Sequence, residues 1–225
     1  MPGGHFNASY PRLARSTAML QHLPHWLGVA LTNVRAGHDR LAVARADLSQ
    51  AVELRLSSPA FANGARLPER FTADGDGVSP PLAWDAPPPG TEALLLLVED
   101  PDAPAPQPLV HAILAGIDPG RNALEEGAIV PDGVGGTDGD SGRNSFLREG
   151  WLPPDPPTGH GAHDYVFQLF ALGPGEAIDA NPGRSDVEQA LGQRPILAVG
   201  TLVGTYSRGE PADIGPAASG AALPA

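Results

Sequence analysis

The amino-acid sequence predicts a mostly β protein: an antiparallel β-sandwich with an N-terminal helical extension and helices near the C-terminus. Apolar and polar residues alternate over 52–56, the pattern of a half-buried strand. Apolar runs at 93–98, 109–117 and 165–172 have the length of strands, and the first is continuous enough to predict burial on both faces. Long irregular connections separate the runs, and 28 glycines and 26 prolines among 225 residues indicate many turns. This pattern favours antiparallel pairing over repeated strand–helix–strand units.

The chain divides into four segments. Residues 1–18 are polar and without periodicity, so we expect disorder there, and Met19 is an alternative start to Met1. Residues 19–50 form the helical extension and 51–208 the β-sandwich domain. The Ala/Gly/Pro-rich residues 209–225 are expected to be a mobile tail.

Helical periodicity is found on both sides of the strands. From 26 to about 48, apolar residues recur at spacings of three, four or seven, which predicts a helix with one apolar stripe. The domain itself or a second copy of the chain must cover this stripe, and we predict self-association, as a homodimer, through it. Near the C-terminus, Ser185 and Glu188 fit a capping box, and the apolar periodicity continues over 196–203.

The composition argues against several classes of function. The net charge is −12 and all 14 basic residues are arginine, whereas nucleic-acid binding requires clustered positive charge. The absence of cysteine excludes disulfides and thiolate metal sites. No apolar stretch is long enough to span a bilayer, and His22, Pro24 and His25 interrupt the one segment that resembles a signal peptide. We expect a cytoplasmic protein with no nucleic-acid partner and no stable membrane insertion.

Two short strings place polar side chains where strands end. Asp100-Pro101-Asp102-Ala103-Pro104 follows the run 93–98, and the Gly/His-rich string 156–165 leads into the next long run. Proline and glycine make such loops stiff or tightly turned, which keeps a polar side chain aimed at a ligand. His111 lies in the following strand. If that strand is the antiparallel neighbour of 93–98, His111 and Asp100 lie at the same end of the sheet.

Each candidate residue also has an ordinary structural explanation. Asp100 and Asp102 can accept hydrogen bonds from backbone N–H groups of a proline-stiffened turn. A lone histidine in an apolar strand, such as His111, is more often structural, and His160 by itself fits a surface loop. His160 and His163 are three residues apart, but the surrounding glycines and prolines oppose a helix that would present both to a metal. A loop whose glycine N–H groups, together with His163, donate to an anion is favoured.

Together the strings resemble the phosphatidylethanolamine-binding protein family, in particular its bacterial Raf-kinase-inhibitor-like branch. The similarity runs from Val52 to Tyr206. It comprises five motifs in the order of the family: Ser79-Pro80-Pro81-Leu82 with Trp84, the run 94–104, Val110-His111, Gly142-Arg143-Asn144-Ser145-Phe146, and 156–165. The segment that includes Val34-Arg35-Ala36-Gly37 is similar to an extension of some bacterial members.

The resemblance implies a small pocket at one end of the sandwich for phosphate, acetate or a phosphorylated head group. The residues that match the pocket of the family are Asp100, Pro104, His111, Gly161, His163 and Tyr165. Supporting positions are expected for Asp102, Trp84 and His160. Two departures stand out. Asp164 replaces a common arginine, which puts a buried ion pair in doubt, and Leu109 and Ala112 replace aromatic residues beside the strand histidine.

We therefore predict non-enzymatic binding of a small anion or phospholipid head group, with no catalytic residue, cofactor or metal, and with a regulatory, kinase-inhibitor-like role as an extension. One alternative is an interaction protein that inhibits a kinase or protease. The other is a metal-dependent hydrolase that uses Asp100, His111 and His163 as ligands or as acid and base, although no nucleophile is evident. In the binding interpretation, His163→Ala abolishes phosphate binding and leaves the melting temperature within a few degrees.

Overall fold

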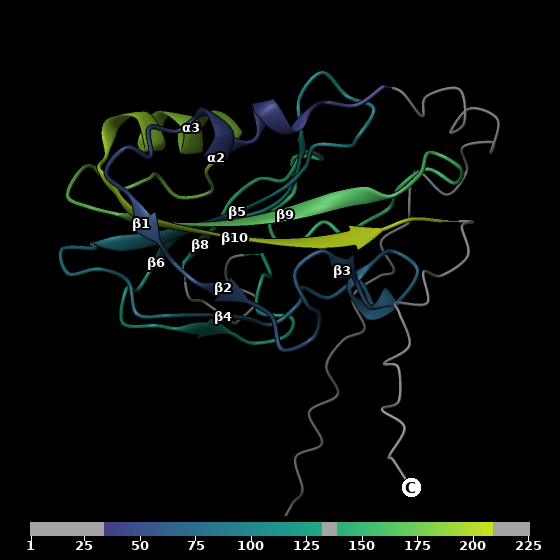
Figure 1. Ribbon diagram of the computed structural model, residues 1–225, viewed down its shortest axis with the longest axis horizontal. Helices are drawn as coiled ribbons and strands as arrows, with labels where there is room; N and C mark the ends of the chain where they lie inside the picture. The colour runs from purple at the N-terminus through teal and green to yellow at the C-terminus, as the bar shows by residue number, and fades with distance from the viewer. Residues whose placement is uncertain (1–33, 132–138, 209–225) are drawn as a thin grey trace, which may run out of the picture.

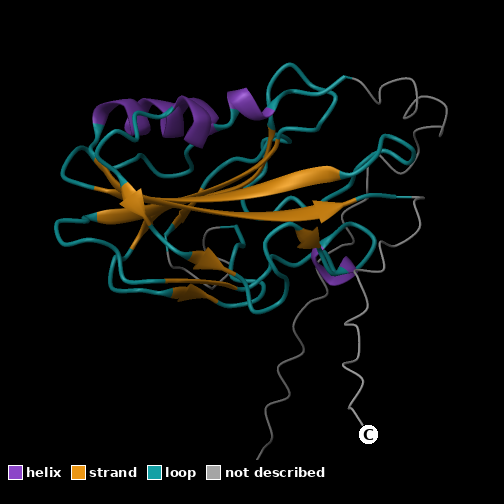
Figure 2. Ribbon diagram, viewed as in Figure 1, coloured by secondary structure: helices purple, strands orange, loops and turns teal. Residues whose placement is uncertain are grey.

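The fold consists of two β-sheets and a layer of helices (Figures 1 and 2). The computed structural model describes residues 34–131 and 139–208. The large sheet has the order β1 (Val52–Glu53), β10 (Ile196–Tyr206), β9 (His163–Leu172), β5 (Ala93–Asp100), β6 (Leu109–Ile117) and β8 (Asp140–Ser141), and β3 (Ala65–Arg66) also pairs with β10. The small sheet has the order β2 (Leu56–Ser57), β4 (Leu82–Trp84) and β7 (Ala123–Leu124). The helical segments are η1 (His38–Arg40), α2 (Ala42–Arg45), η2 (Glu69–Phe71) and α3 (Arg184–Gln193).

Different layers cover the two faces of the large sheet. Helices α2 and α3 lie over one face, and the small sheet lies against the other (Figure 1). The long strands run antiparallel, β10 with β9, β9 with β5, and β5 with β6. Only short strands, β1 and β3, pair with β10 in parallel among the described residues. The predicted antiparallel sandwich is confirmed, with the helices as a third layer.

The central strand β5 contributes to two hydrophobic cores. Leu94, Leu96 and Val98 pack between the two sheets, while Leu95 and Leu97 pack beneath the helices. Burial of each such side chain stabilises the fold by about 1.5–3 kcal/mol. The unbroken apolar run therefore correctly predicted a strand covered on both faces.

Glu99, the next residue of β5, ties the helical layer to the sheet. It is fully buried on the helix side, where its carboxylate accepts hydrogen bonds from Arg184 Nε at 2.7 Å and from Gln168 Nε2 at 2.9 Å. The backbone N–H of Ala42 also donates to it at 2.9 Å. One carboxylate thus links β5 and β9 to α3 and to the start of α2.

The predicted helix over 26–48 is not continuous in its described part. Gly37 has φ 103°, and Leu41 is extended between η1 and the four-residue α2. The backbone here bonds instead to the turn after β5, because Ala36 and Gly37 donate to Ala103 and Pro101 carbonyls. Leu41 and neighbouring apolar residues are buried within this chain, so self-association stays a prediction.

Several sequence-based expectations fall outside the described residues. These are the disorder of 1–18, the alternative start at Met19, the first part of the helical extension up to residue 33, and the mobile tail 209–225. The alternating stretch 52–56, by contrast, is described and forms two short strands instead of one. Because β1 belongs to the large sheet and β2 to the small sheet, this stretch crosses from one layer to the other.

The C-terminal region holds one helix in its described part and then the longest strand. Helix α3 begins at Arg184, and Asp186 accepts a hydrogen bond from Gly183 N–H at 2.7 Å, so the predicted cap by Ser185 and Glu188 is wrong. The apolar residues 196–203 continue as β10 rather than as a helix. By periodicity alone, a short apolar run is compatible with a helix or with a strand. Here the run forms a strand because it pairs with β9 along its whole length.

Candidate functional site

The two polar strings of the sequence meet at one end of the large sheet. β5 ends at Asp100, which pairs with Leu109 at the start of β6, and β9 begins at His163. Because β5 is antiparallel to both neighbours, its last residue lies beside their first residues. Asp100 and His111 therefore lie at the same sheet end, as the sequence predicted.

Asp100, His163 and His160 form a continuous hydrogen-bonded chain, and all three are at most 3% exposed. Asp100 Oδ2 lies 2.8 Å from His163 Nδ1, and His163 Nε2 lies 2.6 Å from His160 Nδ1. The other oxygen, Asp100 Oδ1, accepts the backbone N–H groups of Asp102 at 2.8 Å and Ala103 at 3.0 Å. The expected hydrogen bonds to a proline-stiffened turn are therefore present, and the second oxygen of Asp100 orients His163.

His160 is buried, so its interpretation as a surface loop residue is wrong. Its ring lies against that of His163, with 4.8 Å between centroids. The residues on either side, Gly159 and Gly161, have φ values of 82° and 98°, a region that favours glycine. These two glycines allow the loop to turn the imidazole inward.

A β-bulge determines how His111 is presented. Val98 pairs with Ala112 and Glu99 pairs with Val110, so His111 is an extra residue of β6 between two pairing positions. Bulges bend a strand and re-aim a side chain. His111 is thereby directed toward the aromatic side chains between the sheets.

The ring of His111 is held by two neighbouring segments. Its Nδ1 lies 2.7 Å from Leu152 O, so the ring N–H at this position donates to a backbone carbonyl. The ring also meets Tyr165 edge-on, with 5.0 Å between centroids, and Trp151 at 6.2 Å. Trp151 and Leu152 were not among the site residues predicted from the sequence. A tryptophan just before a proline-rich stretch could have indicated a side chain held beside the site.

Burial keeps both His111 and Tyr165 neutral. It lowers the pKa of His111, and the negative charge of Asp100 opposes this only in part. Burial also raises the pKa of Tyr165 well above its usual value, and the charge of Asp100 adds to the increase. Because the proton of His111 is on Nδ1, its Nε2 is an acceptor, whereas the Tyr165 hydroxyl can donate.

His111 Nε2 and the Tyr165 hydroxyl are both buried and without a hydrogen-bond partner. In residues 34–131 and 139–208, only one other buried side-chain polar atom, Asn181 Oδ1, is in this state. A buried polar group without a partner destabilises a fold by about 1–3 kcal/mol. Two such atoms on contacting rings indicate a place where a ligand can supply the missing partners.

Two other expected residues have mainly structural surroundings. Trp84 lies in β4, packs in the core between the sheets and donates its indole N–H to Arg121 O at 2.9 Å. Pro104 is half-buried in the turn that follows Asp102.

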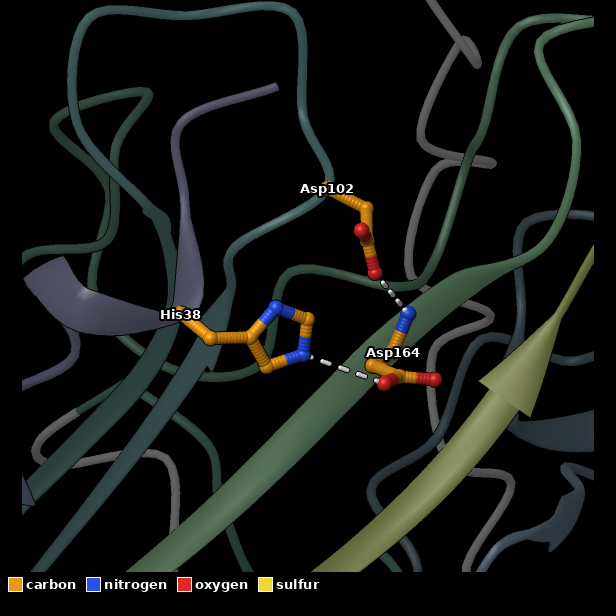
Figure 3. Close-up of side chains that lie close together, drawn as sticks. All are labelled: His38, Asp102 and Asp164. Atoms are coloured by element: carbon orange, nitrogen blue, oxygen red, sulfur yellow. Dashed lines mark hydrogen bonds and ion pairs between the residues drawn. The ribbon is translucent and has the colours of Figure 1, made fainter. Parts of the chain in front are cut away.

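Asp102 is the second buried carboxylate of the site, and the structure gives it an ion pair. One oxygen is bound by Arg35, and the other accepts the backbone N–H of Asp164 at 2.8 Å (Figure 3). The Asp164 carboxylate lies 3.2 Å from His38 Nε2. Asp102 thus has an ion pair with an arginine from before the sandwich domain.

His38, Asp102 and Asp164 are also the one group in the described residues whose spacing could suit a metal ion, with ligand atoms within 4.8 Å of one another (Figure 3). However, Arg35 already binds Asp102. A cation placed here would lie next to a guanidinium group and compete with it, so the arrangement fits an ion-pair network better than a metal site.

Two carboxylates close to the strings are paired with arginines, Asp102 with Arg35 and Asp155 with Arg208. These pairings reduce the negative potential that would otherwise repel an anion from this end of an acidic protein.

The fold is thus a mainly antiparallel sandwich with a buried Asp–His–His chain at one end of its large sheet. The sequence model of the phosphatidylethanolamine-binding protein family matches residues 57–207. The chain belongs to this family, as its motifs predicted.

Proteins similar to this chain carry general names. A "UPF0098 protein" of Methanothermobacter thermautotrophicus is 38% identical over 159 residues, which is 69% of this chain and 100% of that protein. A Mycobacterium tuberculosis protein named "Putative lipoprotein LppC" is 39% identical over 155 residues, 68% of this chain and 72% of that one. Across the described ranges, no helix has the length and apolar character needed to cross a membrane.

Solved structures agree with the family assignment. Escherichia coli YbcL, described as a member of the mammalian phosphatidylethanolamine-binding protein family, superposes with a TM-score of 0.63 at 27% identity. The match covers 69% of this chain and 99% of that one. A phosphatidylethanolamine-binding protein homologue from Chlamydia trachomatis has a TM-score of 0.62 at 29% identity, covering 69% and 98% of the two chains.

Proposed function

We propose that this protein binds a small phosphorylated anion, inorganic phosphate or the phosphate monoester of a free head group such as O-phosphoethanolamine, beside His111 and Tyr165, and that it catalyses no reaction. The observation that carries the proposal is the pair of buried atoms without partners, His111 Nε2 and Tyr165 OH. Membership of the family supports a ligand-binding or regulatory role in general. A kinase-inhibitor-like role is an extension of this proposal.

The protonation states of these two side chains suit a phosphate that carries one proton. The Tyr165 hydroxyl donates to a charged phosphate oxygen, and neutral His111 Nε2 accepts from a P–OH group. A phosphate monoester has its second pKa at about 6, so this form is abundant in mildly acidic solution. The site therefore offers one donor and one acceptor to a ligand that has both.

Ligand entry requires a local movement of the chain. His111 is 3% exposed and Tyr165 is fully buried, so a head group reaches them only when a covering segment shifts.

Tyr165→Phe is expected to weaken phosphate binding about ten- to a hundredfold, because a hydrogen bond to a charged group contributes about 1.5–3 kcal/mol. The free protein should be as stable as the wild type or more so, since the change removes a buried hydroxyl without a partner. Calorimetric titration with phosphate and O-phosphoethanolamine measures the first effect, and thermal unfolding in phosphate-free buffer measures the second.

Tyr206→Phe is a suitable control for this experiment. The Tyr206 hydroxyl donates to Asp74 at 2.7 Å, so its loss should lower stability and leave phosphate affinity unchanged. If Tyr165→Phe binds phosphate as tightly as the wild type, Tyr165 is not a ligand residue and the proposed site is wrong.

Phosphate binding should weaken between pH 6 and pH 8. As the pH rises above the second pKa of phosphate, the ligand loses the proton that it donates to His111 Nε2, and two lone pairs then face each other. Sulfate has the same shape but no proton at either pH, so we expect it to bind weakly at both. Strong sulfate binding at pH 6 that is lost by pH 8 would show that His111 itself carries the proton.

The geometry supports a metal-dependent hydrolase less well. Both oxygens of Asp100 and both ring nitrogens of His163 are engaged in hydrogen bonds within the protein. A metal would have to break these bonds to reach the residues that the alternative requires. Phosphate binding by metal-free protein, measured in the presence of a chelator, distinguishes the two functions.

A further inference from the structure

Residues 34–40, which we call the N-terminal strap, lie across the turn that follows β5. Ala36 N–H donates to Ala103 O at 3.0 Å, and Gly37 N–H donates to Pro101 O at 2.9 Å. These backbone bonds attach the strap to the string that contains both buried aspartates of the site.

The strap also reaches the second string through side chains. Arg35 binds the Asp102 carboxylate and donates from the same nitrogen to Ala162 O at 3.2 Å. His38 lies 3.2 Å from the Asp164 carboxylate, as Figure 3 shows. Arg35 is therefore in contact with both strings, next to the backbone that carries His163.

Asp102 explains why this contact matters. Its side chain is only 7% exposed, and a buried carboxylate is strongly unfavourable without a charged or hydrogen-bonding partner. Its second oxygen holds the backbone N–H of Asp164, the residue directly after His163. Loss of Arg35 would leave a negative charge near the ligand and loosen the anchor of the His163 backbone.

We propose that Arg35 is a positioning residue for the anion site and that it acts through Asp102. It neutralises this carboxylate and holds the Ala162 carbonyl, and so orders the loop that presents His163 and Tyr165. The expected effect of Arg35 on phosphate affinity rests on the proposed function. The strap lies before residue 57, where the region matched by the family model begins.

The test is calorimetric titration with inorganic phosphate on four variants of the full chain. Arg35→Ala should weaken binding about tenfold or more, the effect expected for an unneutralised like charge whose field reaches Tyr165. Arg35→Lys should recover part of the affinity, because it restores the charge without the reach of the guanidinium group. In an Asp102→Asn background, Arg35→Ala should change affinity less than about threefold, because the carboxylate through which Arg35 acts is already neutral and the two substitutions are coupled rather than additive. Equal losses in both backgrounds, or no loss in either, would overturn the proposal.

Arg45→Ala serves as the control. Arg45 is the last residue of α2, shortly after the strap, and it pairs with Glu188 of α3 at 3.2 Å. This substitution should leave phosphate affinity unchanged.

Hydrogen exchange of the Asp164 amide, whose N–H donates to Asp102, tests the positioning role without any ligand. Faster exchange of this amide in Arg35→Ala than in Arg45→Ala supports the positioning role. If the wild type binds no phosphate, the proposed function is rejected, but faster exchange would still support the positioning role. Equal exchange in the two variants would contradict it.

Discussion

His163→Ala should abolish phosphate binding, because it removes the ring that joins Asp100 to the loop of His160 beside Tyr165, and it should lower the free energy of unfolding by about 3–5 kcal/mol, the effect of leaving a buried carboxylate without its partner. His163 is 1% exposed, and its two ring nitrogens bond to Asp100 and His160. Alanine would leave Asp100 Oδ2 and His160 Nδ1 without these bonds inside the protein. The structure thus changes the sequence-based expectation that the melting temperature would stay within a few degrees.

Urea unfolding in phosphate-free buffer measures this loss of stability, and for a domain of this size the melting temperature should fall by roughly 6–20 °C. His38→Ala is the comparison, since His38 forms a solvent-exposed pair with Asp164 that contributes at most about 1 kcal/mol. A His163→Ala variant that melts with the wild type would mean that the Asp100–His163 bond contributes nothing to folding.

Glu99→Ala should lower the free energy of unfolding by a similar amount, about 3–5 kcal/mol, yet leave phosphate affinity unchanged. Glu99 and Asp100 are adjacent in β5, but successive side chains of a strand point to opposite faces. Glu99 is fully buried on the helix side, where it bonds to Arg184 Nε at 2.7 Å and also holds Gln168 and the start of α2. Alanine would leave the Arg184 guanidinium without its buried partner.

Thermal unfolding and phosphate titration of Glu99→Ala, at a temperature where the variant is folded, check both statements. Glu188→Ala removes a carboxylate that is 35% exposed and pairs with the same arginine, so it should cost less than about 1 kcal/mol. Loss of phosphate binding by folded Glu99→Ala would show that the two faces of β5 are coupled. It would also contradict the assignment of Glu99 to stability alone and of Asp100 to the ligand site.

Local sequence patterns were sufficient for the strands that carry the site. The apolar runs became β5, β6 and β9, and each polar string lies directly beside one of these strands. Since antiparallel neighbours exchange ends, the order of the strands was enough to predict Asp100 and His111 at the same end of the sheet. The run 196–203 could not be assigned in this way, because its strand character depends on pairing with β9.

The detailed chemistry of the site depended on contacts between distant segments. The bulge at His111 comes from the register between β5 and β6, and the position of its proton comes from the Leu152 carbonyl 41 residues away. The partner of Asp102, Arg35, is 67 residues away in a segment that the sequence predicted as helical.

By itself, then, the sequence determined the fold class and the residues gathered at one sheet end, because these follow from local periodicity and stiff loops, and its motifs identified the family. Only the tertiary structure decided which nitrogen of His111 is left to accept a hydrogen bond, which buried carboxylates are neutralised, and by which arginine. Those properties are set by burial and by long-range pairing, and neither is encoded in the spacing of neighbouring residues.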